Sequence, residues 1–410
     1  MNASTTERLM LEGIRVIDFT QYVAGPTVTR MMAELGAEII KVEQVPKGDP
    51  ARGIPVTKNR RSAYYIQHNR GKQSICVDYS KPETIPLLHD LIKTADIVVE
   101  NYGPDVMIKR NLGYSALSEI NPKLIMLSIS AFGRTGPLSD RVGFDLIAQA
   151  FSGLMHMTGD PEGPPQFVNM AIADVNAGVH GFASLGYALF YRERTGRGQF
   201  IDVAMVDALY HFHEANVELC TNGKTEFHPN RCGSHNKDLA PYGVFKGPEG
   251  WIVILAGGRQ WAGLPRAMGQ PELVDDPRFA DTRSRGKNHQ ELIDLVEIWM
   301  AKQGSDQAII DALTEQRVPC APVLTVSETV KHPHFIAREM VRKVPDEVFG
   351  GGVTIPGFPI KYSEISKLPE LSTSSMGQDN ADVLKTCLGY SDAQVQNLEE
   401  KGVLMARSTG

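Results

Sequence analysis

Short β-branched runs alternate with helix-like stretches through the first two hundred residues of this chain. The predicted strands are 14–20, 38–43, 74–78, 96–100 and 124–130, and predicted helices lie at 26–36 and 87–95. Strands separated by helices of this length form βαβ units, which build a mostly parallel sheet. Ligands of such sheets bind beyond the carboxyl ends of the strands. The pattern therefore predicts an α/β, Rossmann-like domain with its site at that edge.

The common nucleotide-binding motifs are absent from the sequence. The loop after the first predicted strand, residues 20–26, is not Gly-x-Gly-x-x-Gly, and no Gly-x-x-x-x-Gly-Lys-Ser/Thr occurs. There is also no Gly-x-Ser-x-Gly, the motif that places the nucleophile of many serine hydrolases. Chemistry based on NAD, a P-loop or a serine nucleophile is therefore not expected.

The second half of the chain has a different pattern. Residues 221–240 are polar and typical of a linker, and 243–255 predict a hairpin that helices near 259–269, 286–303 and 305–316 follow. Prolines and a glycine triplet after Val318 predict a loop-rich tail. We therefore expect a large domain over 1–220, a linker and smaller α+β domain over 221–325, and a C-terminal segment over 326–410.

Charge and cysteine content exclude several classes of protein. The 42 basic and 48 acidic residues give a formal net charge of −6, so nucleic-acid binding is not expected and an anionic ligand needs a local basic cluster. The five cysteines are scattered without a Cys-x-x-Cys pair, so we expect neither a disulfide framework nor a thiolate metal site. A reducing cytoplasm fits this pattern best. Without a basic, apolar leader or a run of ~18 apolar residues, we expect an untargeted protein with no membrane partner.

Asp174 is the single carboxylate in the nearly uncharged run 167–190. At the N-cap of a helix it would accept backbone N–H bonds and stay ionised at the positive end of the macrodipole. An ionised, partly desolvated carboxylate is also a usable nucleophile or base. The residues alone leave both roles open.

Two further features point to a ligand without deciding its nature. Gly257 and Gly258 follow a predicted strand, where they allow either close backbone approach to a ligand or a tight turn. Basic residues such as Lys72, Lys109 and Arg110 fall near strand exits, where most are expected to be solvated and a few could converge on phosphates.

Several ordered blocks resemble the class III CoA-transferases, the CaiB/BaiF family. The resemblance covers nearly the whole chain, with blocks at 16–26, 35–43, 69–74, 100–104, 132–137, 143–145, 193–199, 318–323 and 356–361. It implies a ring-shaped subunit with a large Rossmann-like domain, a small domain and a C-terminal segment that returns to the large domain. It also implies an interlocked homodimer.

The resemblance assigns the chemistry to Asp174, which falls in the matching block 173–175. It implies transfer of CoA from an acyl-CoA donor to a free carboxylic acid, through a mixed anhydride and an aspartyl-CoA thioester. Coenzyme A is then a substrate, and no permanently bound cofactor or metal is expected. Such chemistry needs a site that excludes water and donors for each oxyanion.

The resemblance also implies the binding residues. Gln21 and Tyr22 would meet the substrate, and Gly257 and Gly258 would form a covering loop. The implied CoA contacts are Val23, Ala24, Lys72, Val77, Asp78, Tyr79, Ser80, Asn101, Tyr102, Gly103, Lys109, Arg110, Phe144 and Asp145.

The chain departs from two branches of this family. Lys109 and Gln44 stand where formyl-CoA:oxalate transferases carry arginines, and Val23 stands where they carry a substrate-contacting Gln, which argues against oxalate as the acceptor. Phe144 replaces the histidine of the related α-methylacyl-CoA racemases, so two-base proton exchange loses one partner. The racemase reaction and non-catalytic CoA binding are the alternatives to CoA transfer.

Overall fold

The computed structural model describes residues 9–222 and 229–406, which form two compact units. The large unit comprises Met1–Ser152, Val168–Glu214 and His334–Gly410, and the small unit comprises Gly153–Phe167 and Ala215–Pro333. The N-terminal residues on which the absence of a leader was predicted lie partly outside the described ranges, as do residues 223–228 of the predicted linker.

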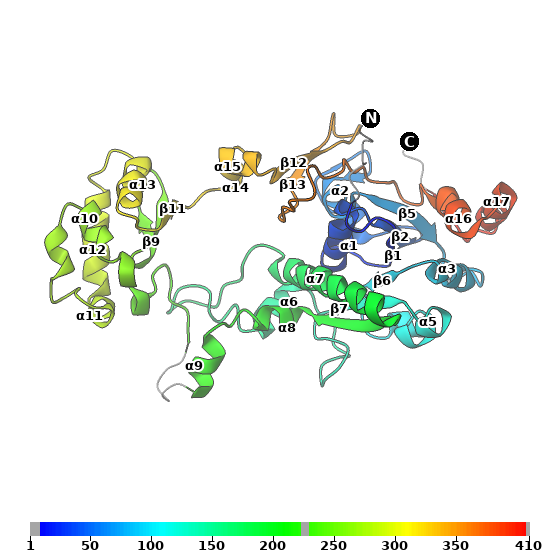
Figure 1. The fold of residues 1–410 in the computed structure, drawn as a ribbon, viewed down its shortest axis with the longest axis horizontal. Helices are drawn as coiled ribbons and strands as arrows, with labels where there is room; N and C mark the ends of the chain where they lie inside the picture. The colour runs from blue at the N-terminus through cyan, green and yellow to red at the C-terminus, as the bar shows by residue number, and fades with distance from the viewer. Residues whose placement is uncertain (1–8, 223–228, 407–410) are drawn as a thin grey trace. The chain divides into compact units, whose positions relative to one another are not determined.

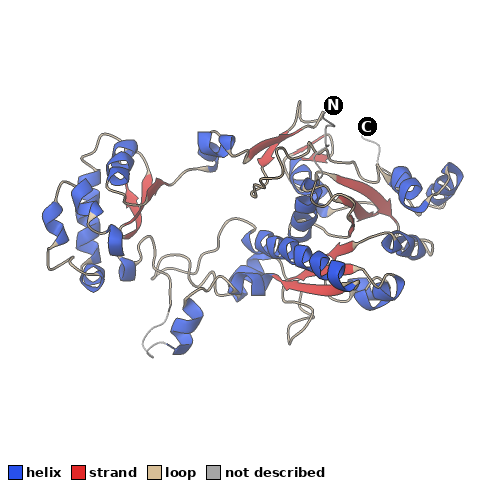
Figure 2. Cartoon of the chain, viewed as in Figure 1, coloured by secondary structure: helices blue, strands red, loops and turns tan. Residues whose placement is uncertain are grey.

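The large unit is built on a parallel sheet, which confirms the predicted α/β class (Figures 1 and 2). In the described residues its strand order is β5 (Lys72–Val77), β2 (Glu38–Gln44), β1 (Arg15–Asp18), β6 (Ile97–Glu100), β7 (Ile125–Ser130) and β8 (Gln199–Ala204). Ile17, Ile40 and Val98 of the central strands are 0% exposed. β-Branched residues suit these strands because a parallel sheet is covered on both faces.

Helices cover both faces of this sheet. They are α1 (Ala24–Glu34), α2 (Ala63–Asn69), α3 (Thr84–Lys93), α4 (Val106–Lys109), α5 (Tyr114–Ile120), α6 (Asp145–Phe151), α7 (Ile172–Thr195) and α8 (Met205–Tyr210). A two-stranded ribbon of β3 (Thr57–Lys58) and β4 (Arg61–Ser62) precedes α2. α8 ends at Tyr210, and α9 (Asn216–Asn222) begins separately in the small unit.

Two glycines bring α7 close to α1 and to the sheet. A Cβ on Gly178 would lie 2.7 Å from the carbonyl oxygen of Ala24, and one on Gly181 would lie 2.9 Å from Leu127. These positions therefore exclude larger side chains, since backbone and packed core atoms cannot move aside cheaply. The close packing holds the first turn of α7, which carries Asp174, beside the start of α1.

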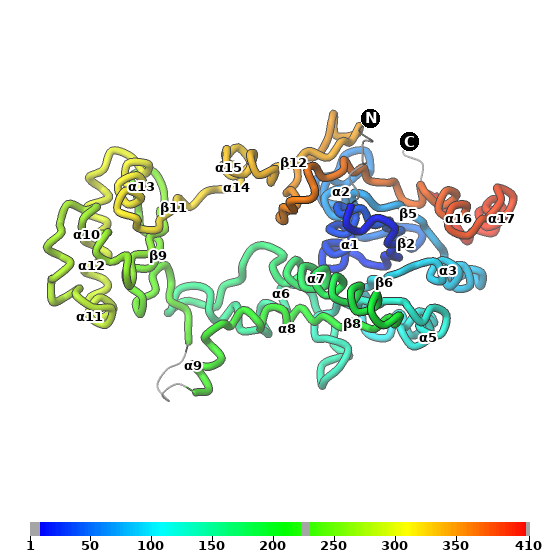
Figure 3. The backbone as a smooth tube through the Cα atoms, viewed as in Figure 1, coloured from blue at the N-terminus to red at the C-terminus, as the bar shows by residue number. Residues whose placement is uncertain are grey.

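The C-terminal segment packs along β5 in the large unit (Figure 3). Asp78 donates its backbone N–H to the carbonyl of Val403, and Leu404 forms an antiparallel bridge with Val77. The segment therefore covers the outer edge of β5, which would otherwise be open. Its elements are β12 (Val341–Val344), β13 (Val353–Pro356), α16 (Asn380–Leu388) and α17 (Asp392–Glu400), after α15 (Pro333–Ala337) at the junction of the units.

The small unit contains the predicted hairpin. β9 (Tyr242–Lys246) pairs antiparallel with β10 (Trp251–Leu255), and β11 (Cys320–Pro322) adds on the other side. Phe245, Ile252 and Phe279 are 0% exposed in its core. Its helices include α10 (Gly263–Ala267), α11 (Thr282–Lys287), α12 (His289–Met300), α13 (Asp306–Glu315) and α14 (Val326–Thr329).

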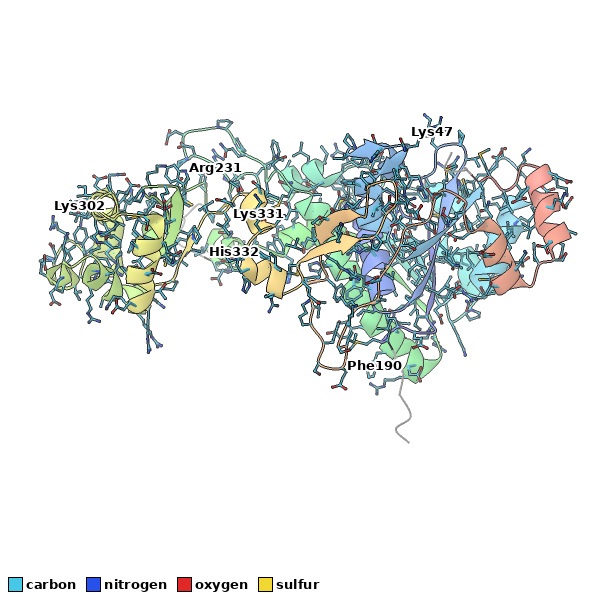
Figure 4. The ribbon with its side chains drawn as sticks, turned by 90° about the horizontal axis from the view of Figure 1, so that it is seen from above. Lys47, Phe190, Arg231, Lys302, Lys331 and His332 are labelled. Carbon is cyan, nitrogen blue, oxygen red and sulfur yellow. The ribbon has the colours of Figure 1, made fainter. Side chains whose placement is uncertain are left out.

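The two units depart from the predicted domain boundaries. Residues 153–167 and 215–220 fall in the small unit rather than the large one, and the small unit extends to Pro333 instead of ending at 325. Arg231, labelled in Figure 4, donates hydrogen bonds to the backbone carbonyls of His156 and Asp160. Gly233 adds a backbone bond to Gly159, so this segment is tied to residues far along the chain that no local pattern reveals.

Neither unit has, in its described residues, a helix long and apolar enough to cross a membrane.

Candidate active site

Two loops meet at the carboxyl edge of the parallel sheet. The backbone N–H of Gln21, after β1, donates to Oδ1 of Asn101 at 2.8 Å, and Nδ2 of Asn101, after β6, donates to the carbonyl of Gln21 at 2.9 Å. Lys41 supports the loop after β1, since its Nζ donates to the carbonyl of Thr20 at 2.7 Å. The edge at which the sequence predicted a ligand is therefore rigidly built.

Tyr22 occupies a conformation that few L-residues adopt, with φ of 63°. Its backbone N–H donates to Oδ1 of Asp49, which is buried and ion-paired with Lys41 at 2.9 Å. The ring of Tyr22 meets the exposed ring of Phe144 edge-on, with centroids 6.2 Å apart. A strained residue held by buried charges is common where a protein contacts a ligand.

Arg110 joins three further strand exits. Its guanidinium stacks 3.9 Å above the ring centroid of Tyr79, which follows β5, and lies 5.7 Å from that of Tyr102, which follows β6. It also donates to Gln44 Oε1, at the end of β2, at 3.2 Å. Arg110 therefore fixes these loops, whereas the adjacent Lys109 side chain is 77% exposed and available to an anion.

The structure contradicts Lys72 as a phosphate contact. Its side chain is 1% exposed, and its Nζ lies 2.9 Å from Asp18 Oδ2. Burial favours the protonated acid, yet Lys72 and then Lys41 hold the pKa of Asp18 well below its usual range. Burial lowers the pKa of Lys72 to about 7, although Asp18 opposes this shift. Lys72 is therefore a buried partner of Asp18 that a ligand on the surface cannot reach.

Asp174 is not the N-cap of its helix, which was one of the two roles that the sequence left open. It is the third residue of α7, and the N-cap is Ala171, which has no side chain able to accept a bond. Asp145, at the start of α6, caps α7 instead: its Oδ2 accepts the backbone N–H of Ala173 at 2.7 Å and of Asp174 at 3.1 Å. Asp145 is thus a structural contact of the helix that carries Asp174.

The protonation of Asp174 also differs from the prediction of a cap-stabilised anion. Burial, and then the charge of Asp145, raise the pKa of Asp174 to about 7. Two carboxylates that share a site resist ionising together. Near neutral pH, Asp174 is therefore a mixture of its protonated acid and its carboxylate anion. This anion is more basic than that of an ordinary aspartate, and hence more nucleophilic.

Tyr64 lies within electrostatic range of Asp174 and was not among the residues that the sequence predicted. Burial, followed by the charges of Asp174 and Asp49, raises the pKa of its hydroxyl to about 12. The hydroxyl therefore remains protonated and able to donate. Tyr64 lies on α2, in a stretch whose pattern gave no sign of a site.

The remaining predicted residues fall into three groups. Val23, Ala24 and Val77 are buried in the walls of the strand exits, whereas Ser80 and Gly103 are exposed. A cavity of about 740 Å³ opens beside Gly103, and Met107, Tyr114, Arg134 and Phe200 are among the residues that line it. Gly257 and Gly258 lie after β10 in the small unit, and their covering role stays a prediction.

The predicted residues of the large unit form a continuous series of contacts. Asp174 meets Asp145, and the neighbouring Phe144 meets Tyr22. Gln21 then meets Asn101, beside Tyr102 and the Arg110 cluster. An elongated ligand could lie along this series, with a reactive end at Asp174 and an anionic end near Lys109.

The model for CoA-transferase family III matches residues 11–380. The chain belongs to this family. It is 30% identical to succinyl-CoA:glutarate CoA-transferase of Mus musculus over 97% of this chain and 91% of that protein. It is 36% identical to acetyl-CoA:oxalate CoA-transferase of Acetobacter aceti over 86% and 89% of the two chains.

Solved structures agree with this assignment. A CaiB/BaiF family protein from Brucella suis superposes with a TM-score of 0.80 at 32% identity, over 93% of this chain and 100% of that one. Rv3272 from Mycobacterium tuberculosis gives a TM-score of 0.82 at 30% identity, over 92% and 99%. The protein is therefore a family III CoA-transferase, whose substrates are CoA thioesters.

One consequence of the raised pKa of Asp174 can be measured without a substrate. An unfolded aspartate has a pKa of about 3.9, so between about pH 4 and 7 the folded state retains the proton longer. Stability is therefore lost as pH rises through this window, by up to about 4 kcal/mol and less where water screens the charge. We expect Asp174→Asn to remove this loss, so that the variant gains stability relative to wild type between pH 5 and 8.

Urea unfolding at several pH values measures this effect. Asp90→Asn, which neutralises an exposed carboxylate on α3, is the matched control and should leave the pH dependence unchanged. Parallel curves for wild type and Asp174→Asn would show that Asp174 titrates normally.

Proposed function

We propose that this enzyme moves CoA from an acyl-CoA to a free carboxylic acid through covalent intermediates on Asp174. The observation that carries the proposal is a carboxylate on the first turn of α7 with a pKa of about 7, at one end of the series of candidate CoA contacts. A partly desolvated carboxylate is a competent nucleophile toward a thioester. Phe144, exposed beside Asp145, supplies no second base for the racemase alternative.

The proposed steps balance in atoms and charge. The Asp174 carboxylate attacks the thioester carbonyl carbon, the C–S bond breaks, and a mixed anhydride and CoA thiolate form. The thiolate attacks the aspartyl carbonyl, which releases the donor carboxylate and leaves an aspartyl-CoA thioester. The acceptor carboxylate opens this thioester to a second anhydride, and the thiolate then attacks the acceptor carbonyl, which regenerates Asp174.

Neighbouring groups fit the needs of these steps. Tyr64 keeps its proton and can donate to an oxyanion near Asp174. Gly257 and Gly258 are proposed as a covering loop that excludes water, because water would hydrolyse the anhydride. The family resemblance, rather than a contact between the units, supports that role.

Peptide mapping of a trapped adduct tests the proposal. The enzyme is incubated with succinyl-CoA, formyl-CoA or acetyl-CoA, which are donors named for relatives of this chain. After a denaturing quench, mass spectrometry should find CoA on the peptide that contains Asp174, and a free acid should remove it. Turnover without any adduct, or exchange of the acyl α-hydrogen in D2O without an acceptor, would reject the proposal.

We expect Lys109 to contribute to CoA affinity. Its ammonium is exposed, and its ion pair with Asp105 is long, at 3.9 Å. A phosphate can therefore compete with Asp105 for the ammonium. Lys109→Met should weaken CoA binding about fivefold, which corresponds to roughly 1 kcal/mol. Calorimetric titration at low and high salt checks this, and the loss should shrink as salt screens the contact. Lys93→Met, at an exposed position of α3, is the control. Equal CoA affinity of both variants would show that Lys109 does not contribute to CoA binding.

A homodimer and a cytoplasmic location are also part of the proposal. Tyr187, Phe190 and Tyr191 of α7 are exposed by 78%, 61% and 47%, and Phe190 is labelled in Figure 4. Contiguous exposed aromatic side chains are typical of a surface that a second subunit covers. The five cysteines are free, as is usual in a reducing compartment.

A further inference from the structure

Asp145 and Asp174 are neighbouring carboxylates with opposite hydrogen-bonding states. Asp145 accepts bonds on both oxygens: Oδ2 takes the two backbone N–H groups of α7, and Oδ1 takes Nε2 of Gln149 at 2.6 Å. The Asp174 carboxylate accepts no hydrogen bond from any residue that the structure describes. Asp145 is therefore fixed and Asp174 is left free to react.

Gln149 locks this arrangement from the next turn of α6. It is 1% exposed, and its Oε1 accepts the backbone N–H of Val168 at 3.0 Å. Its Nε2 also reaches the carbonyls of Val168 and Met170, at 3.2 and 3.3 Å. Asp145 and Gln149 together thus hold the first turn of α7 and the segment before it, from Val168 to Met170.

Two titratable groups interact electrostatically with Asp174. Asp145 belongs to α6, which packs against α7, and the protonated Tyr64 belongs to α2. At the next turns of α7, Thr27 and the Ala24 carbonyl of α1 face Gly178, and the Ala208 carbonyl of α8 accepts from Asn176. The N-terminus of α7 carries a partial positive charge that would stabilise the Asp174 anion. The negative charge of Asp145 lies at this N-terminus and offsets that stabilisation.

We propose that Asp145 is a positioning residue for CoA transfer, which holds the backbone of the nucleophile and places a fixed negative charge beside its carboxylate. This inference rests on the proposed role of Asp174. A more basic carboxylate attacks a thioester faster when ionised, while fewer molecules are ionised at low pH. The rate of adduct formation should therefore rise with pH and reach half its maximum near pH 7, because the pKa of Asp174 is about 7.

Asp145→Asn and Asp145→Ala test this inference, with Asp90→Asn as the control for loss of one remote charge. The readout is the single-turnover rate of CoA attachment to Asp174 at pH 5–9. In Asp145→Asn we expect the half-maximal pH to fall by about one unit or more, and the maximal rate to fall about tenfold as the nucleophile loses its hold. Asp145→Ala should show the same pH shift with a larger rate loss, and Asp90→Asn should match wild type.

A second measurement separates failure of the inference from failure of the proposed function. The change in urea stability caused by Asp174→Asn is followed with pH, with and without Asp145→Asn, and needs no substrate. Asp145→Asn should reduce the pH dependence of that change. A folded Asp145→Asn enzyme with an unaltered pH profile in both measurements overturns the inference. Absence of any adduct in wild type overturns the proposed function instead. The urea measurements then still decide whether Asp145 raises the pKa of Asp174.

Discussion

Asp174→Ala is expected to lower CoA transfer by about 10³-fold or more while CoA binding remains within about twofold of wild type. The large loss follows because the side chain is the group that becomes acylated, and no neighbour can replace it. Asp145, whose carboxylate contacts the backbone of Asp174, has both oxygens occupied by donors. Steady-state transfer with a donor and acceptor pair that wild type uses measures the first effect, and calorimetric titration with CoA measures the second.

Binding survives because the proposed CoA contacts lie on other elements. The loops at Gln21, Asn101 and Tyr102 follow β1 and β6 and do not depend on the Asp174 side chain. Asp174→Asn is the matched isostere and should be equally inactive, since an amide is a poor nucleophile. A variant that transfers CoA at the wild-type rate would show that the covalent step occurs elsewhere or not at all.

Lys72→Met is expected to destabilise the enzyme by roughly 3–5 kcal/mol. The substitution removes one member of a fully buried ion pair and leaves Asp18, 0% exposed, without its nearest cation. Hydrogen bonds from Thr20 and Thr29 to Asp18 remain but cannot supply a positive charge. The midpoint of urea unfolding measures the loss.

The same variant separates structure from binding. Where Lys72→Met is folded, its affinity for CoA should equal that of wild type, because the ammonium lies inside the sheet layer. Lys93→Met, on the exposed face of α3, should change stability by less than about 0.5 kcal/mol. If Lys72→Met instead kept its stability and lost CoA affinity, Lys72 would be the phosphate contact that the family resemblance implied.

The strands could be predicted from the sequence because burial on both faces of a parallel sheet selects uniform apolar runs. β2, β5, β6 and β7 each lie within about two residues of a predicted strand. The edge at which candidate ligand residues gather could be predicted for the same reason, since it follows from strand direction alone. These properties are set by short, periodic stretches of chain.

The details of the site depend on partners that are distant in sequence. The cap of α7 comes from Asp145, which precedes Ala173 by 28 positions, so the local pattern could not exclude Asp174 as the cap. The burial of Lys72 depends on Asp18 at the end of β1, with β2 between the two strands. Tyr64 comes within range of the charge of Asp174 although 110 positions separate the two residues in the sequence. No single window of sequence contains these pairs.

Val403 and Leu404 close the outer edge of β5, beside the candidate CoA loop at Asp78. The two sides of this contact are separated by more than three hundred residues. During synthesis on the ribosome, the early strands therefore keep one edge uncovered until Val403 and Leu404 have emerged. The loop that follows β5 acquires this support only then, so ligand recognition at that loop matures late in synthesis.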